Sequence, residues 1–178
     1  MKPENVLLDK DGYLKLIDYG LSKKINIKRG RTKSFCGTPE YMAPEVLEKK
    51  EYSFAIDYWE LGIFIYEMVI GKPPFFSKDR EEMFDQILNE EIRIPNHLSK
   101  PLIDLLSGLL RKDPSLRLGC LGGFQVIKAH PWFQTINFEQ MLLKKLKPHF
   151  IPSSKSNDDP KLFSQVFLLR TQLLTFQN

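Results

Sequence analysis

The sequence predicts a mainly α-helical fold with one small β-hairpin at its N-terminal end. Residues 55–70 are apolar around nearly the whole circumference of a helix, which indicates a helix buried at the centre of the fold. Two short apolar runs, 6–8 and 13–17, flank the segment Asp-Lys-Asp-Gly at 9–12, a combination typical of a hairpin turn. The 178 residues, of which 42% are hydrophobic, suffice for one well-packed globular domain.

Apolar residues at helical spacing predict three further helices, over 80–89, 101–110 and 124–129. Residues 23–38 contain few apolar side chains, so we expect an exposed loop between the hairpin and the central helix. Towards the C-terminus, residues 148–160 are rich in Ser, Asn, Asp and Pro and predict an extended linker. The apolar segment 163–176 that follows is compatible with a packed helix, an aggregation-prone end or an imperfect gene model.

Composition narrows the function classes. The net charge of +4 is modest and the basic residues are dispersed, so we expect no nucleic acid among the partners. The longest apolar run is interrupted by Glu67, and we therefore expect no membrane span. Cys36 and Cys120 stand far apart without metal-ligand spacing, which favours a reduced intracellular compartment, the cytoplasm by default.

Three sequence blocks occur in order: Met-Lys-Pro-Glu-Asn at 1–5, Asp-Tyr-Gly at 18–20 and Gly-Thr-Pro-Glu-Tyr-Met-Ala-Pro-Glu at 37–45. Together they resemble the C-terminal lobe of a eukaryotic protein kinase. The segments 71–76, 87–95, 109–114 and 130–133 look most like protein kinase B and its relatives in the AGC group, which includes protein kinase C and the cyclic-nucleotide-dependent kinases.

The resemblance implies a protein kinase-like fold, present as the C-terminal lobe only, over 1–133. Residues 136–139 and 148–152 resemble the start of the C-terminal tail of AGC kinases, so 134–178 is expected to be that tail region, divergent after about residue 159.

The resemblance also implies roles for single residues. Asp18 and Asn5 match the carboxylate and the amide that hold magnesium ions in kinases. Lys2 matches the lysine that steadies the transferred phosphate, and Thr38 matches the residue that hydrogen-bonds the catalytic base. Taken alone, Asp18 would more simply start a turn and Asn5 would cap the hairpin; the metal role depends on the surrounding motifs.

Three more residues match structural positions of the family. Glu45 is expected to pair with Arg117, because a buried carboxylate needs a cationic partner. Asp57 resembles a buried aspartate that accepts hydrogen bonds from the catalytic-loop backbone, and we expect it to lack some of those donors here.

Regulation and substrate choice follow from the same resemblance. Ser34 matches the activation-loop phosphorylation site of AGC kinases, with Lys23 as a partner for the phosphate, which implies an upstream activating kinase. The acids Glu4, Glu40 and Glu67 match positions that bind arginine side chains in basophilic members. We therefore expect protein substrates with Arg N-terminal to the target Ser or Thr.

Several kinase motifs do not occur in the sequence: the glycine-rich loop, the ATP-binding lysine, and the His-Arg-Asp motif with the base aspartate. We expect the complete kinase, with its missing N-terminal lobe, to use ATP and Mg²⁺ to transfer the γ-phosphate to Ser or Thr. The 178 residues alone are expected to be inactive and to bind neither cofactor tightly. The alternative from another function class is a noncatalytic docking or inhibitory module, a half-kinase or pseudokinase.

Overall fold

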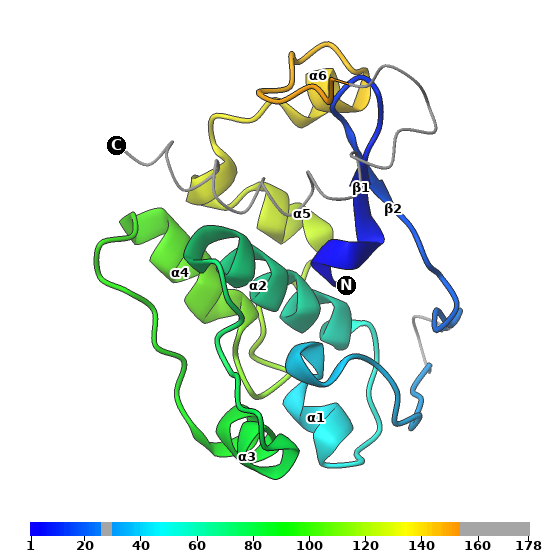
Figure 1. Ribbon diagram of the computed structural model, residues 1–178, viewed down its shortest axis with the longest axis vertical. Coiled ribbons are helices and arrows are strands. Elements are labelled where there is room, and N and C mark those ends of the chain that lie inside the picture. Colours follow the sequence, from blue (N-terminus) through cyan, green and yellow to red (C-terminus); the bar gives the residue numbers. More distant parts are fainter. Residues whose placement is uncertain (26–29, 154–178) are drawn as a thin grey trace.

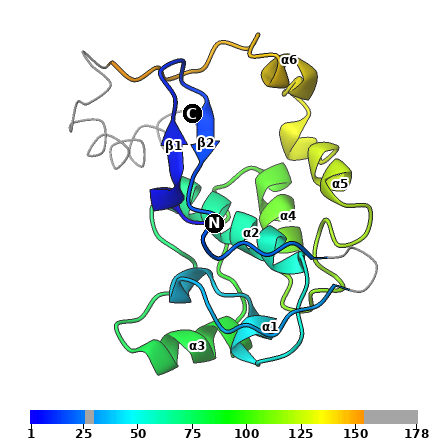
Figure 2. The ribbon, with the colours of Figure 1, turned by 90° about the vertical axis from the view of Figure 1, so that its right-hand side faces the viewer.

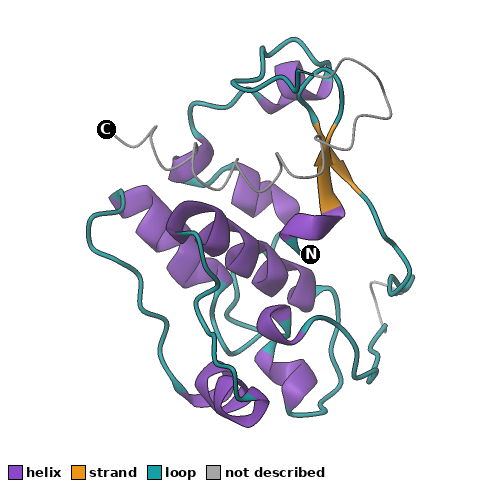
Figure 3. Cartoon of the chain, in the orientation of Figure 1, coloured by secondary structure: helices purple, strands orange, loops and turns teal. Residues whose placement is uncertain are grey.

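The computed structural model describes residues 1–25 and 30–153 (Figure 1). It confirms the predicted class, because helices dominate and a two-stranded antiparallel sheet stands near the N-terminus (Figure 3). The apolar segment 163–176 and most of the predicted linker lie outside the described residues. The elements, with 3-10 helices written η, are η1 Pro3–Asn5, β1 Val6–Leu8, β2 Leu14–Leu16, η2 Pro39–Tyr41, α1 Pro44–Leu47, α2 Ala55–Ile70, α3 Arg80–Asn89, α4 Lys100–Leu109, α5 Phe124–Lys128, η3 Pro131–Phe133 and α6 Phe138–Leu142.

Helices α2 and α4 pack against each other at the centre of the fold (Figure 1). The observed bounds of α2 equal the predicted 55–70, and Trp59 and Ile63 on this helix are fully buried. Gly62 allows the close approach, because a Cβ atom at this position would lie 2.8 Å from the Leu110 side chain. The apolar pattern of α2 therefore serves a tight helix-to-helix contact.

The other helices follow their sequence signals closely. Helix α4 buries one face, formed by Leu102, Leu105, Leu106 and Leu109. Helix α3 has the predicted bounds 80–89 and is capped at its N-terminus by Asp79, whose side chain accepts hydrogen bonds from the backbone N–H groups of Glu81 and Glu82. Helix α5 begins at the predicted residue, Phe124, and ends at Lys128, one residue before the predicted end.

The predicted hairpin is formed by β1 and β2, with Val6 opposite Leu16 and Leu8 opposite Leu14. Its turn is closed by Asp9, whose Oδ1 accepts from the N–H groups of Asp11 and Tyr13. The side chains of β2 are exposed along the whole strand. In both Figure 1 and Figure 2 the segment after α6 passes over the hairpin turn.

The predicted loop over 23–38 is exposed at most of its described residues. Thr32 differs: it is buried and forms an antiparallel bridge with Tyr52, with N···O distances of 2.9 Å in both directions. Within residues 1–25 and 30–153, none of the helices is long and apolar enough to cross a membrane.

Candidate active site

The hairpin brings Asn5 and Asp18 to its open end. Asn5 is the last residue of η1 and immediately precedes β1, whereas Asp18 follows β2 by two residues. The backbone N–H of Ile17 donates to the Asn5 carbonyl at 2.8 Å, which continues the ladder towards Asp18. Asp18 is exposed and adopts a left-handed backbone conformation, with φ of 61°, and its Oδ1 accepts from the N–H of Gly20 at 3.1 Å.

This pair fits a magnesium ion by its chemistry. Mg²⁺ prefers oxygen ligands and is commonly held by one or two protein carboxylates together with substrate phosphates and water. Asp18 offers a carboxylate and Asn5 an amide oxygen. No cluster of three or more His, Cys, Asp or Glu side chains that could hold a metal occurs in the part of the chain that the structure describes. The donors available at the hairpin end therefore suit an ion that phosphate groups also bind.

Lys2 and Thr38 lie at the starts of two 3-10 helices. Lys2 precedes η1 in an extended conformation, so it is three residues from Asn5 in a tight local turn closed by the bond from Asn5 N–H to Lys2 O at 3.0 Å. Thr38 precedes η2 and is partly exposed, and its own carbonyl accepts from the N–H of Tyr41 at 3.0 Å.

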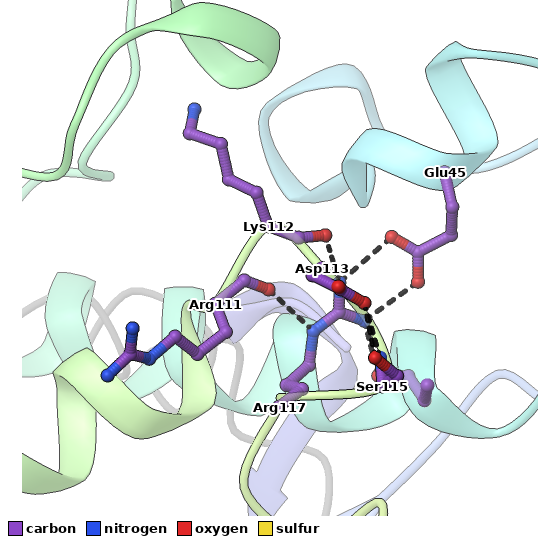
Figure 4. Close-up of polar contacts among 7 residues, drawn as sticks. Glu45, Arg111, Lys112, Asp113, Ser115 and Arg117 are labelled. Atoms are coloured by element: carbon purple, nitrogen blue, oxygen red, sulfur yellow. Dashed lines mark hydrogen bonds and ion pairs between the residues drawn. The ribbon is translucent and has the colours of Figure 1, made fainter.

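Glu45 and Arg117 form a buried ion pair (Figure 4). The guanidinium is bidentate: Nη1 donates to Glu45 Oε1 at 2.7 Å and Nη2 donates to Oε2 at 2.9 Å. The remaining N–H groups donate to the backbone carbonyls of Ala55, Arg111 and Lys112. Because a guanidinium carries five N–H donors, every donor of Arg117 has an acceptor. The side chains are 0% and 4% exposed, so the pair is shielded from water.

The surroundings of this pair hold Arg117 in one orientation. Its guanidinium carbon lies 5.3 Å from the centre of the Trp59 ring, a cation–π contact. The preceding turn is fixed by Asp113, whose Oδ1 accepts from both the N–H and the hydroxyl of Ser115 (Figure 4). The Ser115 hydroxyl is the main cause that lowers the pKa of Asp113.

Asp57 corrects one expectation. We expected it to be buried, but it is exposed in this chain. The reason is its place on α2: two residues before the fully buried Trp59, it lies roughly 200° around the helix from that side chain. Neighbouring atoms still crowd its carboxylate, and this desolvation raises the pKa of Asp57.

The three acids expected to bind arginine differ in exposure. Glu4 in η1 is exposed and Glu40 in η2 is partly exposed. Glu67 on α2 is buried, and the hydroxyl of Tyr41 donates to its Oε2. Since α2 contacts η2, Glu67 and Glu40 lie on adjoining elements. Sequence reasoning missed Tyr41 as a partner of Glu67, although Tyr41 belongs to the block at 37–45.

The loop around Ser34 joins the two residues expected to act together. Lys23 Nζ donates to Thr32 Oγ1 at 2.9 Å, and this hydroxyl lies 3.4 Å from Ser34 Oγ. Ser34 is exposed, and its backbone carbonyl accepts from the Tyr52 hydroxyl at 2.8 Å. Thr32, which sequence reasoning missed, is therefore the link between Lys23 and Ser34.

Comparison with known proteins identifies the family. The sequence model of the protein kinase domain family matches residues 1–133. The chain belongs to the protein kinase family. It is 45% identical over 168 residues to the serine/threonine-protein kinase sgk-1 of Caenorhabditis elegans, covering 94% of this chain and 36% of that protein. It is 46% identical over 171 residues to the RAC serine/threonine-protein kinase of Drosophila melanogaster, covering 94% and 28%.

A third relative covers slightly more of the chain. The chain is 46% identical over 179 aligned positions to the RAC-beta serine/threonine-protein kinase of Homo sapiens, covering 98% of this chain and 37% of that protein. These relatives are AGC kinases, so this kinase chain fits the AGC group. It spans between about a quarter and two fifths of the length of the three relatives described here.

Proposed function

We propose that this chain is the C-terminal lobe and first tail segment of an AGC serine/threonine kinase that transfers the γ-phosphate of ATP to Ser or Thr in protein substrates. The observation that carries the proposal is the hairpin end, where the backbone bond between Ile17 N–H and Asn5 O pairs the segment that carries Asn5 with the segment that leads to Asp18. Phosphoryl transfer depends on such positioned oxygen donors and on charge neutralisation.

In this proposal Asn5 and Asp18 hold Mg²⁺, which neutralises the charge of the ATP phosphates when bound. Lys2 supplies a cation close to the same end of the hairpin, because it lies in the turn that leads into η1. Thr38 orients the catalytic base by a hydrogen bond. Phosphotransfer requires the base and the nucleotide-binding residues of an N-terminal lobe, so we propose that the 178 residues alone do not phosphorylate a substrate.

The exposed apolar side chains near the hairpin support a covering lobe. Leu14, Ile17, Tyr19 and Leu21 are 66%, 39%, 63% and 71% exposed, respectively. Large apolar side chains gathered in this way mark a surface that another folded unit covers. We propose that the N-terminal lobe packs on this face.

We further propose that Glu4, Glu40 and Glu67 bind an arginine of the substrate. A carboxylate recognises a guanidinium by charge-assisted hydrogen bonds, which are stronger than neutral ones. The contact of Tyr41 with Glu67 supports this role, since it holds the carboxylate in one orientation between η2 and α2.

An upstream kinase is proposed to phosphorylate Ser34. Ser34 is exposed, and the Thr32 hydroxyl that lies beside the Ser34 hydroxyl accepts a hydrogen bond from Lys23 Nζ. A phosphate of about −1.5 to −2 charge would attract this ammonium and order the loop.

The test joins the chain, from Lys2 onward, to the N-terminal lobe and catalytic aspartate of the human RAC-beta kinase. With ATP and Mg²⁺ the joined protein is expected to phosphorylate a peptide that carries Arg before Ser, whereas the 178 residues alone are not. Asp18→Asn is expected to lower kcat by at least about 100-fold, because the transition state loses a charge-neutralising contact. Asp85→Asn, an exposed aspartate on α3, is the matched control and should leave the rate unchanged.

Two outcomes would contradict the proposal. Full activity of the Asp18→Asn variant would show that Asp18 is not needed for metal binding. A joined protein that binds the peptide but never phosphorylates it, with every junction tried, would favour the noncatalytic docking module instead. For substrate choice, Glu67→Gln is expected to raise KM for the Arg peptide by about tenfold and to leave KM for an Arg-free peptide unchanged, with Glu81→Gln on α3 as control.

A further inference from the structure

The start of the tail region is fastened to the hairpin turn. Lys144, which follows α6, donates from Nζ to Asp9 Oδ2 at 2.7 Å and lies 3.7 Å from Asp11 Oδ2. The Tyr13 hydroxyl donates to the backbone carbonyl of Leu146. Lys144 Nζ also lies 4.9 Å from the centre of the Tyr13 ring. We call residues 144–150 the tail segment.

The turn and the tail segment are in direct contact at Gly12. A Cβ atom at this position would lie 2.3 Å from the carbonyl oxygen of Phe150 and 2.9 Å from Pro148 Cβ. Gly12 also has φ of 86°, a conformation that side chains disfavour. Only a residue without a side chain lets the tail segment lie this close to the turn.

Lys144 lies at a helix end whose backbone conformation suits glycine. Helix α6 ends in a Schellman motif, in which Lys144 N–H donates to Met141 O at 3.0 Å and Lys145 N–H donates to Gln140 O at 2.8 Å. Lys144 occupies the left-handed position of this motif, with φ of 55°. Glycine adopts this conformation without steric cost, so Lys144→Gly removes the ammonium from Asp9 without straining the helix end.

Asp9 divides its two oxygens between the turn and the tail. Oδ1 accepts from the N–H groups of Asp11 and Tyr13 at 3.0 and 2.9 Å, and Oδ2 accepts from Lys144. The bond from Lys144 is the largest cause that lowers the pKa of Asp9 to about 2. One carboxylate thus closes the turn and connects it to the tail segment.

Contacts at the hairpin turn affect the position of the opposite, open end of the hairpin. Each strand has three residues, so the turn lies roughly 10 Å from the open end. The side chains of β2 are exposed, and a two-stranded hairpin has little stability of its own. Contacts at the turn therefore matter for the position of the whole ladder, which ends in the bond between Ile17 N–H and Asn5 O.

We propose that Lys144 is a positioning residue of this kinase: by its ion pair with Asp9 it holds the hairpin turn against the tail segment, and so fixes the open end that carries Asn5 and Asp18. The assignment of a metal to that end rests on the proposed function. The fastening of the hairpin does not.

The first experiment measures hydrogen exchange of the Ile17 amide by NMR in the 178-residue chain. In Lys144→Gly the helix end keeps a favourable residue while the ammonium is lost. The exchange rate is expected to rise about three- to tenfold, since local opening becomes easier. Lys144→Arg is expected to restore the rate of the unmodified chain to within about twofold, because it keeps a cation in reach of Asp9.

Lys49→Gly is the matched control. Lys49 also stands in the left-handed position of a Schellman motif, after α1, with φ of 56° and its backbone N–H bonded to Val46 O at 3.1 Å. Its side chain is exposed. This variant should leave Ile17 exchange unchanged. Asp9→Asn keeps an oxygen for the turn but loses the ion pair, and is expected to match Lys144→Gly.

Two results would overturn the fastening: an Ile17 exchange rate in Lys144→Gly no faster than in Lys49→Gly, or a fast rate in Lys144→Arg. The consequence for the metal end is measured in the protein joined to an N-terminal lobe. There Lys144→Gly is expected to raise the Mg²⁺ concentration for half-maximal rate by about threefold or more, with the peptide KM unchanged. An unchanged Mg²⁺ requirement refutes the positioning role. If Asp18→Asn is fully active, the proposed metal role of Asp18 fails, while the exchange rates still decide the fastening.

Discussion

The buried pair of Glu45 and Arg117 gives the sharpest stability prediction. Arg117→Met leaves a carboxylate that is 4% exposed without its cation. It also removes the donors to the carbonyls of Arg111 and Lys112, which lie outside helices. Breaking a buried pair by removing one partner costs about 3–5 kcal/mol, because the remaining charge is uncompensated. In a chain of this length that loss lowers Tm by roughly 6–20 °C.

A double-mutant cycle isolates the interaction of the two side chains. Glu45→Leu combined with Arg117→Met removes both charges, so the double variant is expected to be more stable than the sum of the single losses predicts, by about 2–3 kcal/mol. Lys50→Met is the control for loss of a cation at the surface: its pair with Glu48 is 2.8 Å long, but the side chains are 64% and 39% exposed. This control should cost less than about 1 kcal/mol.

Urea unfolding followed by far-UV circular dichroism measures these losses. Tryptophan fluorescence is unsuitable for the cycle, because Arg117 lies over the Trp59 ring and its removal changes the emission of the folded state. The reasoning is refuted if Arg117→Met costs no more than Lys50→Met, or if the two single losses add up to that of the double variant.

Three further predictions follow from other contacts. The pKa of Asp9 is about 2 in the folded chain, below its unfolded value of 3.8, so its contribution to stability is complete above about pH 3.8 and is lost as the pH falls towards 2. The difference in unfolding free energy between the unmodified chain and Asp9→Asn, measured by urea unfolding, should therefore narrow over that range. A constant difference would contradict this. Gly62→Val is expected to cost about 1–3 kcal/mol by overpacking against Leu110, and an unchanged urea midpoint would argue against a tight contact of α2 with α4. Lys112→Met removes the donor to the carbonyl of Ile87 in the last turn of α3 and should cost about 1–3 kcal/mol, with faster amide exchange at the end of α3; equal exchange would show that water replaces the ammonium.

The long helices could be predicted because their patterns extend over several turns. The bounds of α2 and α3 agree with the sequence at both ends. The segment predicted as 101–110 forms α4 from Lys100 to Leu109, since Ser99 precedes the helix and Pro101 fits its first turn. The short helices α1 and α6 were not predicted, although α5 of similar length was, because four or five residues give only a weak helical pattern.

Residue types located the candidate site, but packing decided its environment. The resemblance to kinase motifs identified Asn5 and Asp18, and the turn signal between two short apolar runs predicted the hairpin that carries one of them at each end. The burial of Glu67 and the exposure of Asp57, both on α2, depend on which side of the helix meets other elements, and a helix that is apolar all round gives no signal for that side. The contact of Lys144 with Asp9 joins residues 135 positions apart and leaves no periodic pattern in the sequence.

The geometry of Arg117 also bears on the order of events in folding. Its guanidinium bonds to Glu45, to the start of α2 at Ala55 and to the turn at Arg111 and Lys112, and the first of these contacts closes 72 residues of chain. These partners can be satisfied together only after the three segments have met, so we expect the pair to form late, on the native side of the folding barrier. Interactions absent from the transition state set the unfolding rate and leave the folding rate nearly unchanged. We therefore expect Arg117 chiefly to slow the unfolding of the folded kinase lobe.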